Sequence, residues 1–309
     1  MRIAVIGAGG VGGYFGARLV QAGEDVVFVA RGAQLDAIRT AGLTIESPRG
    51  NAALGPQQAT DVPAEVGPVD AVLLCVKTWQ AADAVRAIPP LLGPETCVVP
   101  FQNGVEAADD LVAALGPAPV LGGVAKIVAF IDGPGHIRDV GGPTAAAFAE
   151  LDNRPSARVE RLRDAFRRAG LEVETPADIH AAIWIKFMFV ASAGGVGAVA
   201  RMPIGVLRRV PATRGLLESA MAEIGALARA RAVRLPDDIV GRTMAFVDTL
   251  PAEGTASLQR DIAEGRRSEL DWWSGAVVRL GRAAGVPTPI HAFIYDCLLP
   301  SELHARGLL

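Results

Sequence analysis

Apolar runs and helical patterns alternate through the first half of the chain. Short apolar runs predict buried strands at residues 3–6, 26–30, 71–76 and 96–100. Helical spacing of apolar positions predicts helices at residues 11–22, 33–41, 81–88 and 105–115. Because strands that alternate with helices build parallel sheets, we expect an α/β fold with a doubly wound parallel sheet and right-handed crossovers.

Residues 120–151 interrupt this alternation. Apolar runs at 120–131, 136–140 and 145–151 surround the turn Asp132-Gly133-Pro134-Gly135. This pattern predicts antiparallel strands added at an edge of the parallel sheet.

Strand patterns disappear after about Asp178. The remaining sequence predicts helices at residues 179–193, 204–209, 211–233, 236–248, 257–264, 268–284 and 289–299. The change of pattern falls near Thr175-Pro176. We therefore expect an α/β domain at residues 1–176 and a second, all-α domain at residues 177–309.

Composition fits this division and excludes several classes of protein. The 309 residues are enough for about two domains. The chain is 50% hydrophobic and 20% charged, which is typical of globular proteins and not of disordered ones. Its net charge of -3 argues against a nucleic-acid partner. The three cysteines are too scattered for a disulfide framework, and no cluster has metal-ligand spacing, so we expect no metal.

No targeting or membrane segment is expected. Met1-Arg2 leads directly into a short apolar strand, which lacks the core and cleavage pattern of a signal peptide. The longest apolar run, 181–195, is interrupted by Lys186 and is shorter than the ~20 residues of a spanning helix. These features predict a cytoplasmic protein with no membrane partner.

A glycine-rich motif follows the first predicted strand and opens the first predicted helix. Residues Gly7, Ala8, Gly9, Gly10, Val11 and Gly12 match the pattern GxGxxG. Glycines there let the chain turn sharply and let backbone N–H groups approach a pyrophosphate at the helix N-terminus. The motif predicts a Rossmann-type dinucleotide site, and the alternative is an ordinary strand-to-helix turn.

The second predicted strand decides which dinucleotide fits. It ends at Val29-Ala30-Arg31-Gly32, and Asp25 lies at its other end. An acidic residue at the carboxyl end selects NAD, whereas a basic residue there accepts the 2′-phosphate of NADP. Arg31 therefore predicts NADP, and the alternative is a solvated surface arginine.

Lys186 is the strongest candidate for proton transfer. It lies in residues 181–190, which are apolar on nearly every helical face and therefore predict a buried helix. A lysine there must be paired, extend to the surface, or have a lowered pKa that suits a proton donor. The alternative is a lysine that extends to solvent at a domain edge.

Other candidates have strong structural alternatives. Lys77 and Asn103 follow predicted strands at the ligand-binding end of the sheet, although Asn103-Gly104 also reads as a turn. Ser257 and Glu269 fit helix-capping roles. The histidines lack a pattern that would position them for proton transfer, and we expect structural or exposed roles for His136, His180, His291 and His304.

Together these pieces resemble the ketopantoate reductase (2-dehydropantoate 2-reductase) family over nearly the whole chain. The resemblance rests on residues 6–16, Arg31, 76–80, 102–104, 184–187, and above all on 257–261 followed by 265–271. It implies a Rossmann domain with a helical domain, and NADPH-dependent reduction of 2-dehydropantoate, a 2-oxo acid, to (R)-pantoate in pantothenate biosynthesis.

The resemblance also implies residue roles. Lys186 matches the general acid, and Glu269 matches the glutamate that binds the substrate hydroxyl, so these two form the expected catalytic pair. Ser257 and Asn103 are expected to bind substrate. The cofactor contacts are expected from Gly7–Gly12, Arg31, Lys77, Asn103 and Glu269.

One departure from the family concerns the substrate pocket. Characterised members carry asparagines four and eight residues after the lysine, where this chain has Val190 and Gly194. Losing two amides weakens a pocket built to hydrogen-bond its substrate. The alternatives are therefore a reductase of a different, bulkier or more apolar 2-oxo acid or ketone, and a non-catalytic NADPH-binding sensor.

The sequence does not decide the oligomeric state. The apolar helical half and the adjacent Trp272-Trp273 offer a candidate homodimer surface. The alternative is that both tryptophans pack within the chain.

Overall fold

The computed structural model describes residues 1–142 and 144–309, which form two compact units. The sheet unit comprises Met1–Gln102 and Glu106–Ile179. The helical unit comprises His180–Leu309 together with the short segment Asn103–Val105, which follows a strand of the sheet unit along the chain.

A five-stranded parallel sheet forms the centre of the sheet unit. Its strand order is β5-β2-β1-β6-β7, which confirms the expected α/β class. The strands are β1 (Arg2–Ile6), β2 (Asp25–Val29), β5 (Ala59–Thr60), β6 (Val69–Leu74) and β7 (Leu92–Pro100).

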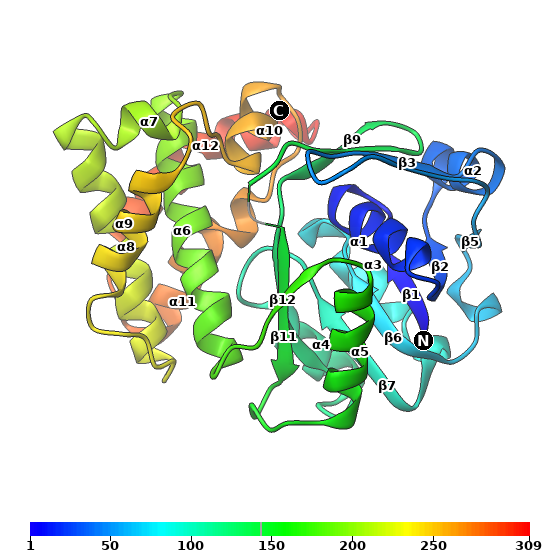
Figure 1. Ribbon diagram of the computed structural model, residues 1–309. Helices are drawn as coiled ribbons and strands as arrows, with labels where there is room; N and C mark the ends of the chain where they lie inside the picture. The colour runs from blue at the N-terminus through cyan, green and yellow to red at the C-terminus, as the bar shows by residue number, and fades with distance from the viewer. Residues whose placement is uncertain (143) are drawn as a thin grey trace. The chain divides into compact units, whose positions relative to one another are not determined.

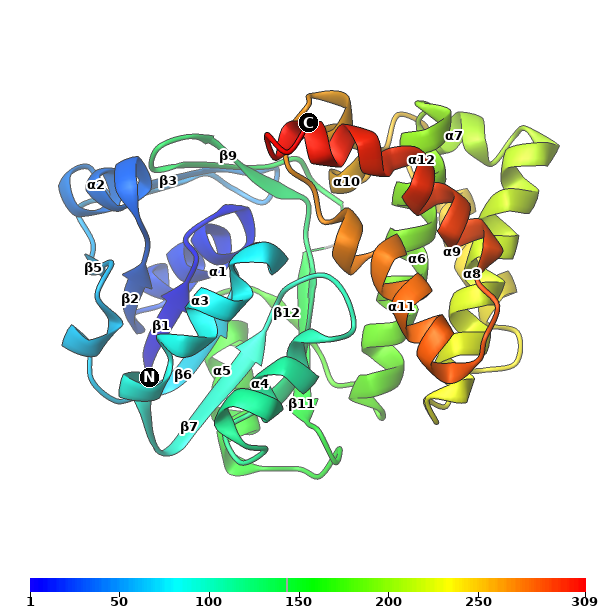
Figure 2. The same ribbon diagram turned by 180° about the vertical axis from the view of Figure 1, so that it is seen from behind.

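Both faces of this sheet are buried, which explains why its strands read as continuous apolar runs. On β1, Ile3 and Val5 pack into one apolar cluster, and Ala4 and Ile6 pack into another. Helices α1 (Gly10–Gln21) and α5 (Ala157–Arg168) cover the first face (Figure 1). The opposite face is covered by α3 (Ala81–Arg86) and α4 (Ala107–Leu115) (Figure 2).

Residues 120–151 do form antiparallel pairs, but the expectation of one added edge is wrong. They divide between two further sheets, ordered β4-β3-β10-β9 and β12-β11-β8. Strand β10 pairs in parallel with β3, so that His136 lies opposite Thr44. Local sequence patterns do not reveal a partner so distant in the chain. The strands are β3 (Leu43–Glu46), β4 (Ala52–Leu54), β8 (Leu121–Lys126), β9 (Ala129–Gly133), β10 (His136–Asp139), β11 (Ala145–Glu150) and β12 (Glu172–Glu174).

Short helical segments complete the sheet unit. Helix α2 follows β2, and three 3₁₀ turns lie in the connections around β6 and β7. Their bounds are α2 (Gly32–Thr40), η1 (Pro63–Glu65), η2 (Thr78–Gln80) and η3 (Pro89–Leu91).

The helical unit packs around α6 (Figure 1). Apolar residues of α6, α8, α9, α11 and α12 share one core. The helices are α6 (Ile179–Ala200), α7 (Ile204–Leu207), α8 (Pro211–Ala230), α9 (Ile239–Thr249), α10 (Ser257–Ala263), α11 (Ser274–Ala284) and α12 (Pro289–Ala305), with a 3₁₀ turn η4 (Leu270–Trp272) before α11.

Helix α6 is longer than the sequence indicates. Its 22 residues are long and apolar enough to span a membrane, so the expectation of too short a run is wrong. Of its most apolar stretch, 61% is buried within the protein, as in the core helix of a globular fold. The predicted helix ends before Gly194 because glycine disfavours helices. In the structure the helix continues, and side chains of other segments pack closely against Gly194, Gly195 and Gly197.

The predicted helix at 268–284 is broken. Residues 270–272 form the 3₁₀ turn η4, and Trp273 has φ -104° and ψ -95° before α11 begins. This break separates Glu269 from the regular helix.

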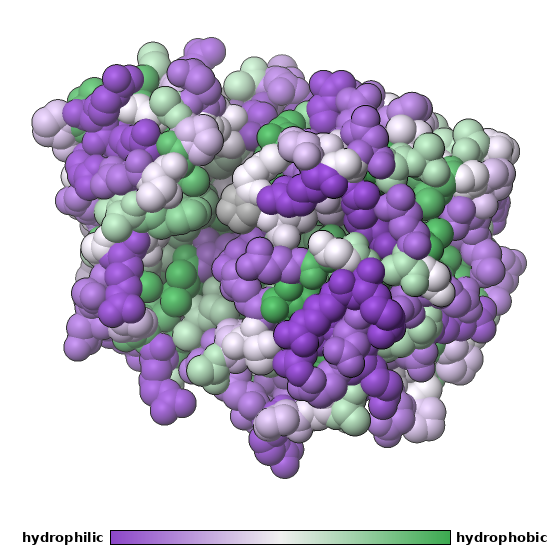
Figure 3. Space-filling model, viewed as in Figure 1, coloured by the Kyte–Doolittle hydropathy of each residue, from purple (hydrophilic) through white to green (hydrophobic). Residues whose placement is uncertain are grey.

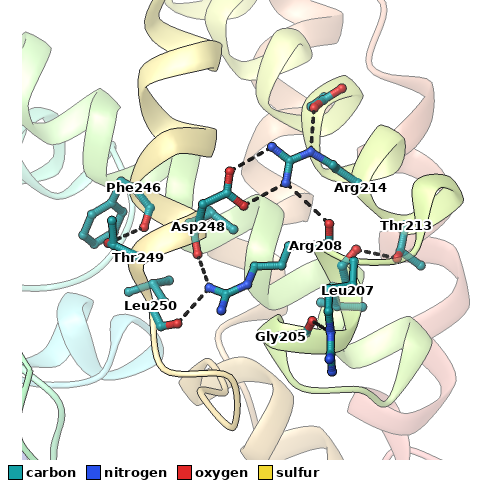
Figure 4. Close-up of polar contacts among 12 residues, drawn as sticks. Gly205, Leu207, Arg208, Thr213, Arg214, Phe246, Asp248, Thr249 and Leu250 are labelled. Carbon is teal, nitrogen blue, oxygen red and sulfur yellow. Dashed lines mark hydrogen bonds and ion pairs between the residues drawn. The ribbon is translucent and has the colours of Figure 1, made fainter.

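Two arginines join α7, α8 and the end of α9 (Figure 4). The Arg208 guanidinium donates to the carbonyls of Val247 and Leu250, at 2.7 and 2.8 Å. Arg214 forms a bidentate pair with Asp248, at 2.8 and 2.9 Å. Cations at these carbonyls satisfy the acceptors that a helix C-terminus leaves open.

The tryptophan pair packs within the chain. Trp273 is buried, and Trp272 packs against the same core. Figure 3 shows polar residues over most of the visible face, with apolar residues distributed among them. A homodimer through the helical unit stays a prediction.

The buried His291 predicts acid sensitivity. Burial lowers the pKa of His291 to about 4, against an unfolded value near 6.5. Between these values the unfolded chain binds a proton that the folded chain does not. The free energy of unfolding is therefore unaffected by His291 above pH 6.5 and decreases as the pH is lowered from 6.5 to 4. The loss approaches about 3 kcal/mol at pH 4.

Urea unfolding between pH 7 and pH 4 measures this loss. We expect His291→Gln to reduce the pH dependence by that amount, and the exposed His304→Gln to leave it as in the wild type. The same dependence of unfolding free energy on pH in all three proteins would contradict the lowered pKa of His291.

Candidate active site

The glycine-rich loop is shaped by close backbone approach. Gly7 has φ +94°, a conformation that favours glycine, and a Cβ there would lie 2.8 Å from the Val76 nitrogen. A Cβ on Gly12 would lie 2.1 Å from the Gly7 oxygen, and one on Gly10 would lie 2.1 Å from the Ala129 oxygen. By contrast, a Cβ on Gly9 would meet no atom within 4 Å.

This loop fits the pyrophosphate of a dinucleotide. Gly9 is the N-cap of α1 and supplies no side-chain acceptor, so the first N–H groups of the helix face the open space at Gly9. Gln34 fixes the loop from α2, because its amide donates to the Ala8 carbonyl at 2.8 Å and accepts from Gly135 N at 2.9 Å. Sequence reasoning missed Gln34, whose only signal is its position one helical turn after Arg31.

Arg31 lies just beyond the carboxyl end of β2, at the N-cap of α2, and is exposed. Asp25 is the first residue of β2, at the opposite end of the strand. Within the described residues, the Arg31 side chain has no ion-pair partner. A guanidinium in this place suits a phosphate group.

Lys77 and Gln102 lie just beyond the carboxyl ends of β6 and β7. The Lys77 ammonium lies 5.6 Å from the centre of the Trp79 ring. The Gln102 amide donates to the Val76 carbonyl at 3.1 Å and so ties the two strand ends together.

Three of the candidate residues meet in the helical unit. Lys186 Nζ donates to Asn103 Oδ1 at 2.9 Å, and Asn103 Nδ2 donates to Glu269 Oε2 at 3.3 Å. One amide thus bridges an ammonium and a carboxylate, which fixes which end of Asn103 faces each group.

Burial makes this cluster chemically demanding. Glu269 is 3% exposed, and Lys186 is half-buried on the apolar helix α6. Charged groups removed from water need polar partners. Gly104, with φ +106°, turns the chain after Asn103, so the expected turn and the bridging amide occur in one segment.

The face of α6 beyond Lys186 is apolar, and an indole closes it. Val190 and Gly194 follow Lys186 at intervals of one and two helical turns. A Cβ on Gly194 would lie 2.6 Å from Cζ3 of Trp273 and 3.2 Å from Cβ of Ala256. The space of a side chain at 194 is therefore already filled. The sequence offered Trp273 as part of a homodimer surface, with packing inside the chain as the alternative, and did not place it beside position 194.

Ser257 lies beside this face but outside the hydrogen-bonded cluster. It is the first residue of α10, and Ala256 is the N-cap, so the expected N-cap role of Ser257 is wrong. In the part of the chain that the structure describes, Ser257 does not hydrogen-bond to Lys186, Asn103 or Glu269.

His291 is structural. Its ring nitrogens lie 3.3 Å from Ser274 Oγ and 3.2 Å from the Ala220 oxygen. Among residues 1–142 and 144–309, no group of His, Cys, Asp or Glu has the arrangement of a metal site.

The parallel sheet carries a glycine loop that suits a pyrophosphate, and the helical unit holds a lysine–amide–carboxylate cluster. This combination is typical of a two-domain nicotinamide-dependent oxidoreductase. The comparisons with known proteins give the family. Residues 3–153 match the model of ketopantoate reductase PanE/ApbA, and residues 178–302 match its C-terminal model. The chain belongs to the ketopantoate reductase family, whose members are NADP-dependent oxidoreductases that act on CH–OH groups.

Individual relatives cover nearly the whole chain. A 2-dehydropantoate 2-reductase of Mesorhizobium japonicum is 32% identical and covers 94% of each protein. The uncharacterized oxidoreductase YkpB of Bacillus subtilis is 27% identical over 96% of this chain and 97% of its own. The crystal structure of a PanE/ApbA family ketopantoate reductase from Ralstonia eutropha JMP134 has a TM-score of 0.89 and 32% identity, over 99% of this chain and 100% of the other.

Two glycines of the loop give a matched pair of variants. Gly12→Ala places a methyl group against backbone and is expected to cost about 1–3 kcal/mol of stability. Gly9→Ala meets open space and is expected to change stability by less than ~1 kcal/mol. Its methyl group enters the space assigned to the pyrophosphate, so NADPH affinity is expected to fall about tenfold or more.

Urea unfolding and NADPH fluorescence titration measure the two effects. Unchanged NADPH affinity in a folded Gly9→Ala variant would place the pyrophosphate elsewhere.

Proposed function

We propose that this protein reduces 2-dehydropantoate to (R)-pantoate with NADPH, in the cytoplasm, as a step of pantothenate biosynthesis. Membership of the ketopantoate reductase family supports the reaction class. The observation that supports the residue assignment is the hydrogen-bonded series Lys186–Asn103–Glu269. It connects an ammonium group that can donate a proton to a buried carboxylate that can bind a substrate hydroxyl.

Lys186 is the proposed general acid. NADPH, when bound, supplies the hydride that adds to the carbonyl carbon of the 2-oxo acid. As the carbonyl oxygen gains negative charge, Lys186 Nζ gives it a proton, and the product is a 2-hydroxy acid. Solvent then returns a proton to the neutral amine. Asn103 Oδ1 accepts a hydrogen bond from the ammonium and so holds Lys186 in one orientation.

Glu269 and Ser257 are the proposed substrate anchors. The Glu269 carboxylate accepts from Asn103 through one oxygen, and we assign to this group the hydroxyl of the substrate. Ser257, at the first turn of α10, is assigned to the substrate carboxylate together with helix N–H groups. Asn103 contacts substrate and nicotinamide ribose in this scheme.

Most of the proposed cofactor contacts lie in the sheet unit, and Asn103 and Glu269 of the helical unit complete the set. Residues Gly7–Gly12 bind the pyrophosphate, as the open space at Gly9 supports. Arg31 binds the 2′-phosphate through its exposed guanidinium, and Lys77 binds at the carboxyl end of β6.

A second candidate function is reduction of a more apolar 2-oxo acid. Val190 and the indole of Trp273 beside Gly194 give the α6 face no amide donors or acceptors for a substrate hydroxyl. The same packing argues against a simply enlarged pocket, because the indole fills the space at position 194.

A substrate panel tests the proposed reaction. We expect NADPH oxidation with 2-dehydropantoate to exceed that with ketoisovalerate, phenylpyruvate and other 2-oxo acids by about tenfold or more in kcat/KM. NADH in place of NADPH is expected to lower kcat/KM by a similar factor, because Arg31 loses its charged partner.

Preference for an apolar 2-oxo acid would support the second candidate. Tight NADPH binding without turnover of any substrate would indicate a sensor and overturn both.

Removing Lys186 tests the catalytic assignment. We expect Lys186→Met to lower kcat by about 10²–10⁴-fold, because no proton donor remains at the carbonyl oxygen. NADPH affinity, measured by fluorescence titration, is expected to stay within about twofold, since the cofactor contacts lie on other residues.

Arg242→Ala, which removes an exposed ion pair with Asp238, is the matched control and is expected to keep full turnover. Wild-type kcat in folded Lys186→Met would remove this residue from the mechanism.

A further inference from the structure

The segment that carries Glu269 is not held by a regular helix. The turn of η4 follows it, with Trp272 N and Trp273 N both donating to the Glu269 carbonyl, at 3.1 and 3.0 Å. The helix that follows begins at Ser274 and has no side-chain cap. The position of Glu269 therefore depends on contacts made by its neighbours.

Glu302 of α12 holds the residue immediately before Glu269. One oxygen of this carboxylate accepts from Ser268 N at 2.9 Å and from Ser268 Oγ at 2.6 Å. Glu302 is 1% exposed and Ser268 is fully buried. A buried carboxylate is costly without partners, and here Ser268, the residue that adjoins Glu269, donates two hydrogen bonds to it.

The same helix holds the segment again on its other side. Asp271 accepts from Tyr295 Oη at 2.8 Å and from an Arg306 nitrogen at 2.9 Å. Ser274 lies 3.3 Å from the His291 ring. Positions 268, 271 and 274 thus face α12, while Glu269 faces Asn103 instead.

We propose that Glu302 is a positioning residue for Glu269, and that α12 sets the geometry of the catalytic cluster through it. The carboxylate fixes the backbone N–H and the hydroxyl of Ser268 together, which sets the direction in which the chain enters residue 269. Without it, the segment stays attached at Asp271, but Ser268 N and Ser268 Oγ both lose the acceptor that they share. Glu269 then loses its alignment with the Asn103 amide. This inference rests on the proposed function, since it assigns Glu302 an effect through Glu269.

A double-mutant cycle measures whether Glu302 acts through Glu269. We expect Glu302→Ala to lower kcat/KM for the 2-oxo acid about tenfold, with KM for NADPH within about twofold of wild type. In a Glu269→Gln background, the same substitution is expected to change kcat/KM by less than about twofold, because there is no carboxylate left to position. Glu302→Gln, which retains one acceptor oxygen, is expected to restore most of the activity.

Matched variants separate positioning from loss of stability. Asp248→Asn breaks the Arg214 pair in the same unit, far from the segment in sequence, and is expected to lower Tm without changing kcat/KM (Figure 4). Ser268→Ala removes the hydroxyl that donates to Glu302 and accepts from Leu270 N, but it keeps the backbone contact with Glu302. It provides a folded test if Glu302→Ala does not fold. It is expected to lower kcat/KM about threefold in the wild-type background only.

The outcomes distinguish the two proposals. Full activity of Glu269→Gln would remove Glu269 from the proposed mechanism, and the role of Glu302 with it. If Glu269→Gln is impaired but Glu302→Ala or Ser268→Ala lowers kcat/KM equally in both backgrounds, the positioning role alone is overturned.

Discussion

The candidate site is organised around one electrostatic requirement. Lys186 carries its ammonium on an apolar core helix, so the ammonium needs a hydrogen-bond acceptor. An ion left without partners in such surroundings costs several kcal/mol. Asn103 meets this need for Lys186 and in turn donates to Glu269. Asn103 thereby joins the segment that follows β7 to α6 and to Glu269.

Close packing around α6 supplies the second constraint. Glycines at positions 194, 195 and 197 let Trp273, Ile294 and Gln259 approach the helix where a methyl group would collide. These contacts keep a glycine-rich stretch helical against its intrinsic preference. They also give the face beyond Lys186 its apolar character, which bears on the choice of substrate.

Much of the fold follows from local patterns because each of these elements has a recognisable sequence pattern of its own. Strands buried on both faces read as apolar runs, and a glycine loop between a strand and a helix reads as a phosphate site. The two smaller sheets escaped prediction because their pairings are distant in sequence, as between β3 and β10. The break at Trp273 also escaped, since side-chain contacts with α12 replace helical hydrogen bonds there.

The sequence by itself determined the α/β sheet, the helical second half, the glycine loop and the candidates Lys186, Asn103 and Glu269. Residue type and spacing carry that information, because they reflect hydrophobic periodicity and the chemistry of single side chains. Tertiary structure alone decided that one amide bridges the lysine and the glutamate, that an indole fills the space at position 194, and that Glu302 anchors Ser268. Each of these joins segments far apart in the chain, and only folding brings such groups within hydrogen-bond or van der Waals distance.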